Sequence, residues 1–141
     1  MNEREIKEML PYVDFQSHTK FHPILTKCSE QVSLDEIDSS KKFLQQLLNR
    51  PVQHFSYPNG AYTKREIYFL IKSGYASART NDWGWNSVNS NPYRLKTIII
   101  DENASLSKLS AQLTGCYRII ELFCNNLGFN LNHHFSTRFN Q

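Results

Sequence analysis

One stretch decides the fold of this chain: Asp14-Phe15-Gln16-Ser17-His18-Thr19-Lys20-Phe21-His22-Pro23. Before the histidines, Val13 and Phe15 alternate with polar neighbours, and this period of two predicts a short strand over Tyr12–Gln16. Pro23 disfavours helical φ/ψ angles at His22. The two histidines are therefore expected on a loop that leaves the strand, and not on a helix.

His18 and His22 are candidate ligands of a divalent metal ion, with zinc as the first choice. Neutral imidazoles suit zinc, and two of them on a short constrained loop can share one ion. The alternative is that both are ordinary loop histidines whose rings make hydrogen bonds. Their spacing alone leaves both interpretations open.

Composition limits the class of protein. The 141 residues, 40% hydrophobic and 21% charged, are typical of one globular domain with a proper core. The net charge is +3, and the Lys and Arg residues are scattered, so we expect no nucleic-acid partner. Three cysteines without C-x-x-C spacing argue against a disulfide framework and against a cysteine metal site.

The sequence contains neither an apolar run of membrane-spanning length nor the basic and apolar start of a signal peptide. The chain as given is therefore expected in the cytoplasm, and no membrane span is expected in it.

The remaining elements alternate between helices and strands. Besides Tyr12–Gln16, strands are predicted at Val52–Tyr57, Tyr75–Thr80 and Lys96–Ile100. Helices are predicted at Glu3–Leu10, Ser33–Asn49, Thr63–Gly74, Ser105–Leu113 and Cys116–Leu127, the second and third opened by the capping boxes Ser33-x-x-Glu36 and Thr63-x-x-Glu66. This order predicts an α/β fold with about four largely parallel strands, whose chemistry collects at the carboxyl ends of the strands.

Several motifs together resemble one family. Ser17-His18-Thr19-x-x-His22-Pro23-Ile24-Leu25-Thr26 is similar to the second motif of the polysaccharide deacetylases (chitooligosaccharide deacetylase-like), whose two histidines bind a divalent metal. The bacterial branch of that family has further motifs in the order found here: Phe55-Ser56-Tyr57-Pro58-Asn59-Gly60, Gly74-Tyr75, Ala78-Arg79-Thr80 and Asp101-x-x-x-Ser105-Leu106. The resemblance covers roughly Glu3 to Gly115 and implies that the sheet is part of a distorted (β/α) barrel.

The resemblance implies metal-dependent hydrolysis of acetyl groups on an N-acetylated amino-sugar polymer, with that polysaccharide or its oligosaccharides as partners. In the family, one aspartate acts as general base and a second is the third metal ligand. Both belong to an earlier motif, Phe-Asp-Asp-Gly, and this chain has no adjacent Asp-Asp pair. Residues 1–115 are thus expected to be the C-terminal part of a deacetylase domain, weak or inactive alone.

Two alternatives to an enzyme stay open. One is a non-catalytic carbohydrate-binding remnant of such a domain. The other is an unstable remnant without a role, because a partial barrel exposes sheet edges.

Two aspartates are candidates to replace the missing metal ligand, Asp14 and Asp82. Asp14 lies about 13 Å from His18 if each strand residue rises about 3.3 Å, which is too far to share an ion. Asp82 is the better candidate, although an Asx-turn before Gly84 is an equally good explanation of it. The acid histidine of the family has no counterpart after the last strand, and Ser56 stands where other branches have an arginine.

Substrate contacts are expected at Tyr57, Pro58, Asn59, Gly60, Trp83 and Trp85. The Pro-Asn-Gly loop offers backbone N–H groups to an oxyanion or is an ordinary turn, and the tryptophans stack on sugar rings or cover the core. The apolar helix within 116–128 is predicted to pack in the core or in a homo-oligomer, and 129–141 is predicted to be a frayed tail.

Overall fold

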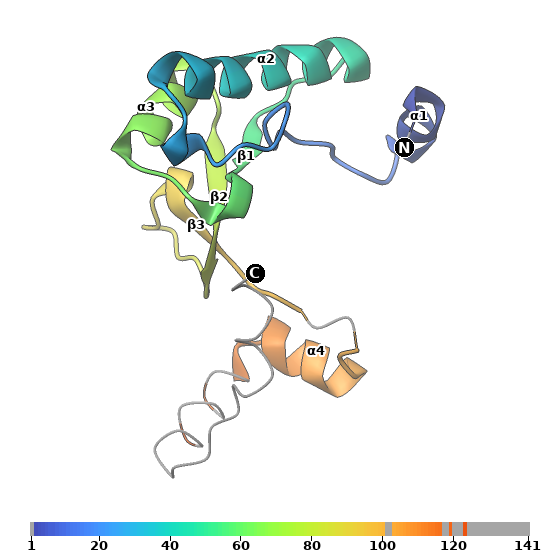
Figure 1. The fold of residues 1–141 in the computed structure, drawn as a ribbon. Helices are drawn as coiled ribbons and strands as arrows, with labels where there is room; N and C mark the ends of the chain where they lie inside the picture. Colours follow the sequence, from blue (N-terminus) through green and yellow to red (C-terminus); the bar gives the residue numbers. More distant parts are fainter. Residues whose placement is uncertain (1, 101–102, 117–118, 120–122, 124–141) are drawn as a thin grey trace. The chain divides into compact units, whose positions relative to one another are not determined.

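The computed structural model describes residues 2–100, 103–116, 119 and 123. The chain forms two compact units, Met1–Thr97 and Ile98–Gln141. The first unit contains a parallel sheet with the strand order β1-β2-β3 (Figure 1). The strands are β1 at His54–Ser56, β2 at Ser77–Trp83 and β3 at Leu95–Thr97.

The predicted strand Tyr12–Gln16 is reduced to one bridge, in which Ser17 pairs in parallel with Phe55. Gln16 explains the difference: its side-chain Oε1 accepts the backbone N–H groups of Gln53 at 2.9 Å and His54 at 2.8 Å. A side chain thus takes the place of the ladder, and only Ser17 exchanges backbone hydrogen bonds with the strand. The segment still runs along the edge of β1 and delivers His18 where the strand ends.

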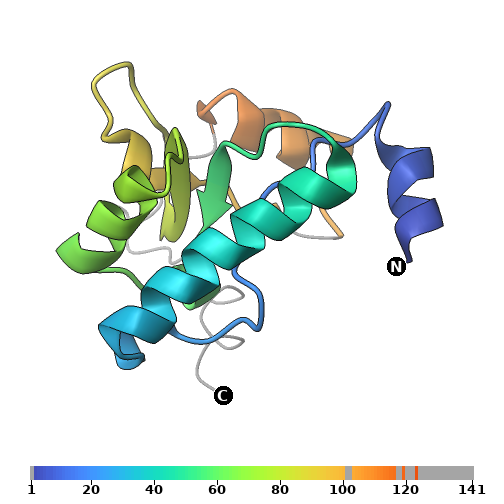
Figure 2. The ribbon, with the colours of Figure 1, turned by 90° about the horizontal axis from the view of Figure 1, so that it is seen from above.

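Helices α2, at Glu30–Leu48, and α3, at Lys64–Lys72, contact each other and lie on one face of the sheet (Figure 1, Figure 2). The short helix α1 at Glu3–Met9 precedes them. Three 3₁₀ turns complete the first unit, at Leu25–Lys27, Pro58–Gly60 and Pro92–Arg94.

The ends of α3 confirm the sequence prediction. Thr63 caps its N-terminus in a capping box with Glu66, and Gly74 follows its C-terminus at a φ of +71°. The end of α2 is also as predicted, because Asn49 caps it in the left-handed region. Its start is not: α2 begins four residues earlier, where Ser29 accepts the N–H of Val32. The predicted capping box at Ser33 and Glu36 is therefore wrong.

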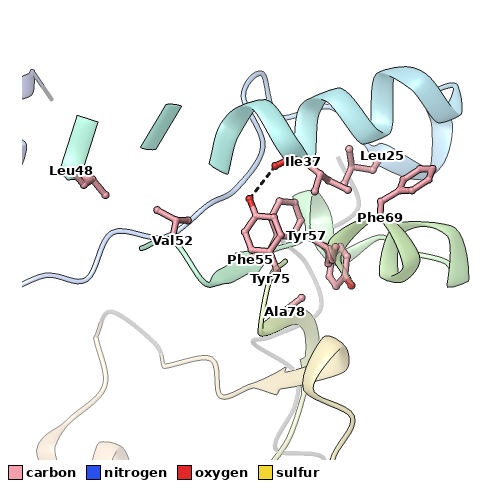
Figure 3. Close-up of a cluster of buried hydrophobic side chains, with 10 residues drawn as sticks. Leu25, Ile37, Leu48, Val52, Phe55, Tyr57, Phe69, Tyr75 and Ala78 are labelled. Carbon is pink, nitrogen blue, oxygen red and sulfur yellow. Dashed lines mark hydrogen bonds between the residues drawn. The ribbon is translucent and has the colours of Figure 1, made fainter. Parts of the chain in front are cut away.

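The core lies between the sheet and the two helices. Figure 3 shows Ile37 from α2 and Phe69 from α3 facing Phe55 and Ala78 of the sheet, all of them buried. The hydroxyl of buried Tyr75 donates to the carbonyl oxygen of Ile37 at 3.0 Å and ties the chain after α3 to α2. An open pocket of about 460 Å³ lies along the sheet, with His18, His54, Ser56, Ser77 and Arg79 among its walls.

All three strands differ from their predicted bounds, and β1 is shorter than the predicted Val52–Tyr57 at both ends. β2 runs on to Trp83, beyond the predicted end at Thr80, and β3 ends at Thr97 and not at Ile100. The side chain of Asn86 bonds both backbone groups of Lys96 at 2.9 Å, so the connecting loop folds back onto β3. The local sequence pattern does not predict this contact between Asn86 and Lys96.

In the second unit, α4 spans Leu106–Leu113 with Ser105 as its N-cap, as predicted. The predicted helix at 116–128, the tail at 129–141 and Asp101 lie wholly or largely outside the described residues. Within the described part of the chain, no helix is both long enough and apolar enough to span a membrane.

Candidate functional site

His18 leaves the edge of the sheet with its ring held by the backbone. Its Nδ1 lies 2.7 Å from the carbonyl oxygen of Ser56 at the end of β1. A carbonyl oxygen only accepts, so in the neutral ring Nδ1 carries the proton and Nε2 presents the lone pair. Metal-binding histidines are commonly oriented in this way by a backbone carbonyl.

His22 is brought against His18 by a tight turn. The ring centroids lie 4.7 Å apart at an interplanar angle of 68°. Thr19 and His22 both have left-handed backbones, with φ of 65° and 57°, and the His22 N–H donates to Thr19 Oγ1 at 3.0 Å. Such conformations cost about 1–3 kcal/mol each in non-glycine residues and gather at functional sites. The loop therefore holds the two imidazoles together at a cost in backbone strain.

The turn rests on helix α2. The buried carboxylate of Glu36 accepts the N–H groups of Lys20 at 2.8 Å and Phe21 at 3.0 Å through one oxygen, Oε2. One helical turn later, the hydroxyl of Ser40 lies 2.7 Å from that of Ser17, which directly precedes His18.

Sequence reasoning missed this support. Ser33, Glu36 and Ser40 are all buried and follow one another at helical spacing, so they form a polar stripe along α2. The pattern Ser33-x-x-Glu36 is also that of a capping box, so it predicts a helix start and not a buried stripe. The sequence signal for this support was the spacing of Ser33, Glu36 and Ser40, three and four residues apart beside the apolar stripe.

The two histidines fit part of a metal site. Their imidazoles are suitable zinc donors and lie at the solvent-exposed end of the loop. Among the described residues, no three side chains of His, Cys, Asp or Glu form a group that could hold a metal ion. The described residues therefore offer at most two ligands for such an ion at this place, His18 and His22, and their role as ligands stays a prediction.

Asp82 does not join the histidines in such a group. It lies in β2 and lines a separate polar pocket of about 190 Å³ together with Asn86, Arg94 and Lys96. Its own N–H donates to Thr80 Oγ1 at 3.1 Å. The structure thus offers no geometry for Asp82 as a replacement for the missing ligand.

Tyr57 and Pro58 are buried beneath the loop at the end of β1. The Tyr57 hydroxyl donates to the carbonyl oxygen of Tyr93 at 3.0 Å. The ring of Tyr57 stacks on that of Tyr62, with the ring centroids 4.9 Å apart. Burial raises the pKa of the Tyr57 hydroxyl. Their side chains therefore support the loop from below, and direct substrate contact by them stays a prediction.

Asn59 and Gly60 form the bend of this loop, with φ of 55° and 69°, and Asn59 is exposed whereas Gly60 is half-buried. A Cβ on Gly60 would lie 2.8 Å from the backbone nitrogen of Asn81, so only glycine fits here. The Gly60 N–H donates to the carbonyl oxygen of Tyr57 at 2.9 Å. That bond agrees with the ordinary-turn alternative for Gly60, whereas substrate binding by Asn59 stays untested.

Trp83 ends β2 with 38% of its surface exposed, and Trp85 follows on the loop with 42% exposed. Each ring has both a covered and an open part. Stacking on a sugar ring and partial cover of the core are both compatible with this exposure.

Comparison with known proteins identifies a family for the chain. Residues 1–78, more than half of the chain, match the family model "Polysaccharide deacetylase". A comparison with curated proteins found no match.

Solved structures give the same fold. The deacetylase PplD of Streptococcus pyogenes, in complex with acetate, is 28% identical with a TM-score of 0.75 over 79% of this chain and 50% of its own. A polysaccharide deacetylase from Bacillus cereus is 23% identical with a TM-score of 0.72, over 80% of this chain and 36% of its own. IcaB from Ammonifex degensii is 19% identical with a TM-score of 0.68, over 79% of this chain and 52% of its own. The chain spans about half of the first relative, and it belongs to the polysaccharide deacetylase family.

Proposed function

We propose that this chain supplies the two-histidine side of the metal site in a deacetylase that removes acetyl groups from an N-acetylated amino-sugar polymer. The observation that carries the proposal is the orientation of His18: Ser56 accepts its Nδ1 proton at 2.7 Å, and His22 lies against its ring. The similarity to PplD, solved in complex with acetate, supports acetyl hydrolysis as the reaction class.

In this proposal, the residues of this chain bind the metal ion and orient the sugar substrate. His18 and His22 are suited to hold a divalent ion, with zinc as the first choice, through Nε2 of His18 and a ring nitrogen of His22. When bound, such an ion supplies electrophilic polarisation of the acetyl carbonyl. Trp83 and Trp85 offer exposed ring surface against which sugar rings can stack. Asn59, exposed on the loop that follows β1, offers an amide to polar substrate groups.

A second candidate is a non-catalytic carbohydrate-binding module. It is favoured by one observation: no acidic residue among the described ones joins His18 and His22 in a metal-binding group. Hydrolysis needs a base on the attacking water, and a module without one retains only the binding surfaces.

Zinc titration followed by an acetate assay tests the proposal. We expect the purified chain to bind one zinc ion per molecule, measured by calorimetry, and to lose this binding in His18→Ala and His22→Ala. His54→Ala is the matched control, because the ring of His54 bonds Ser77 and lies on the same sheet face. Wild-type protein without zinc affinity contradicts the metal site.

The assay on N-acetylated chito-oligomers separates the two candidates. Release of acetate that depends on zinc and on both histidines supports the deacetylase. Oligomer binding that survives both histidine variants, with no acetate released, supports the binding module.

A further inference from the structure

We infer that Glu36 is a positioning residue of the histidine site: its buried carboxylate sets the backbone of the turn that holds His18 and His22 together. The inference rests on the proposed function for its metal ligands. It goes further by assigning a role to a residue on a helix that neither carries the histidines nor binds the metal.

The Glu36 carboxylate reaches from α2 to the backbone of the histidine turn. Glu36 is 7% exposed, and its Oε2 accepts the N–H groups of Lys20 and Phe21 at 2.8 and 3.0 Å. These are consecutive residues in the middle of the turn. Two successive N–H groups that converge on one anion form an anion-binding nest, and the charge makes both bonds stronger than bonds to a neutral acceptor.

The nest lies where it can fix the conformation of the histidine turn. Lys20 and Phe21 separate the two histidines, between the left-handed residues Thr19 and His22. A turn with two strained residues relaxes unless its surroundings hold it. The Glu36 carboxylate supplies that hold from inside the protein, so the outward side of the turn stays available for the imidazole rings.

Ser40 completes the support four residues further along the same face of α2. Its hydroxyl meets that of Ser17 at 2.7 Å, immediately before His18. Helix α2 therefore contacts the chain at two places: at Ser17, just before His18, and at Lys20 and Phe21, between the two histidines. The ring centroids then lie 4.7 Å apart, and Glu36 acts on their arrangement through the backbone N–H groups of Lys20 and Phe21.

The test compares Glu36→Gln, which keeps the shape and removes the charge, with Asp35→Asn as the matched control. Asp35 is an exposed acid on the same helix, next in sequence to Glu36. Glu36→Asp is a second variant, since its shorter carboxylate keeps the charge and allows partial rescue. Amide hydrogen exchange at Lys20 and Phe21 is measured relative to the α2 amide of Ile37, so global destabilisation cancels.

We expect exchange at these two amides to be about tenfold faster in Glu36→Gln, with zinc affinity reduced about tenfold by chelator competition. Asp35→Asn should leave both quantities as in wild type. Unchanged exchange at Lys20 and Phe21 overturns the inference, as does unchanged zinc affinity in a variant whose wild type binds zinc. Wild-type protein that binds no zinc overturns the proposed function instead, and the exchange measurement alone then decides whether Glu36 sets the turn.

Discussion

Glu36 and Glu66 are two buried glutamates in the same four-residue pattern, and they serve different parts of the molecule. Glu66 is bonded by near neighbours: its Oε2 accepts the N–H and the hydroxyl of Thr63, and Arg65 pairs with Oε1 at 2.7 Å. Glu36 instead reaches Lys20 and Phe21, sixteen and fifteen residues away in sequence. One pattern thus closes a helix start, and the other holds a distant loop.

The difference follows from what precedes each pattern. Ser29 already caps α2, so the chain is helical before it reaches Ser33, and the side chain of Glu36 is free to face the histidine turn. Thr63 is preceded by extended chain, so it becomes the N-cap, and Glu66 closes the box. The same residues therefore stabilise either a helix end or a tertiary contact, depending on where the helix begins.

The largest predicted effect is loss of stability in Glu66→Ala. The variant leaves Arg65 without its carboxylate, and Arg65 also donates to the carbonyl oxygen of Leu25 at 2.8 Å. Breaking a buried charge network of this kind costs about 3 kcal/mol of unfolding free energy, measured by urea denaturation. Glu36→Ala should cost less, because its charge faces backbone donors. A larger cost for Glu36→Ala would reverse the comparison.

The free energy of unfolding at acidic pH tests the role of Glu66 separately. Burial raises the pKa of Glu66, but hydrogen bonds from Thr63 and Arg65 outweigh it and lower the pKa below its ordinary value of 4.5. A lowered folded-state pKa contributes stability that is present above pH 4.5 and is lost as the pH falls through the folded pKa. Wild type should therefore lose stability below pH 4.5 more steeply than Glu66→Gln. Parallel curves of unfolding free energy against pH would refute this.

Much of the fold was predictable because it depends on local chemistry. The box at Thr63, the end of α2 at Asn49 and the parallel α/β order all follow from short-range patterns, and the structure confirms them. The histidine loop was predicted for the same reason, since Pro23 excludes a helix there. Its metal-binding role stays a prediction.

What was missed depends on contacts between distant residues. The side chain of Gln16 takes the place of backbone hydrogen bonds in the first predicted strand. Glu36 does not cap a helix but accepts hydrogen bonds from the histidine turn. Asp82 was proposed from its place after a strand, but β2 continues through it and carries it to another pocket. Helical spacing in the sequence can mark polar positions such as Glu36 and Ser40, but it does not identify the remote backbone that such side chains contact.

A smaller effect is expected at the two helix starts. Ser29→Ala removes the acceptor for the Val32 N–H, and Thr63→Ala removes that for the Arg65 N–H. Loss of an N-cap costs about 1 kcal/mol, and thermal or urea unfolding of both variants should show it. The loss at Thr63 should be the larger, because its hydroxyl also donates to Glu66 at 2.6 Å. Equal stability of Ser29→Ala and wild type would contradict the observed start of α2.

The smallest effect is expected in Ser33→Ala, and it separates the two patterns most directly. Ser33 is buried inside α2, where its hydroxyl makes only a long bond of 3.4 Å to Glu66 Oε1. That oxygen keeps Arg65 as its partner, and alanine has the highest helix propensity, so the gain offsets most of the loss. We expect a change within about 0.5 kcal/mol in the same unfolding measurement. A cost as large as that of Thr63→Ala would mean that α2 starts at Ser33 in solution, and Glu36 would then be drawn back to the helix end and away from the histidine turn.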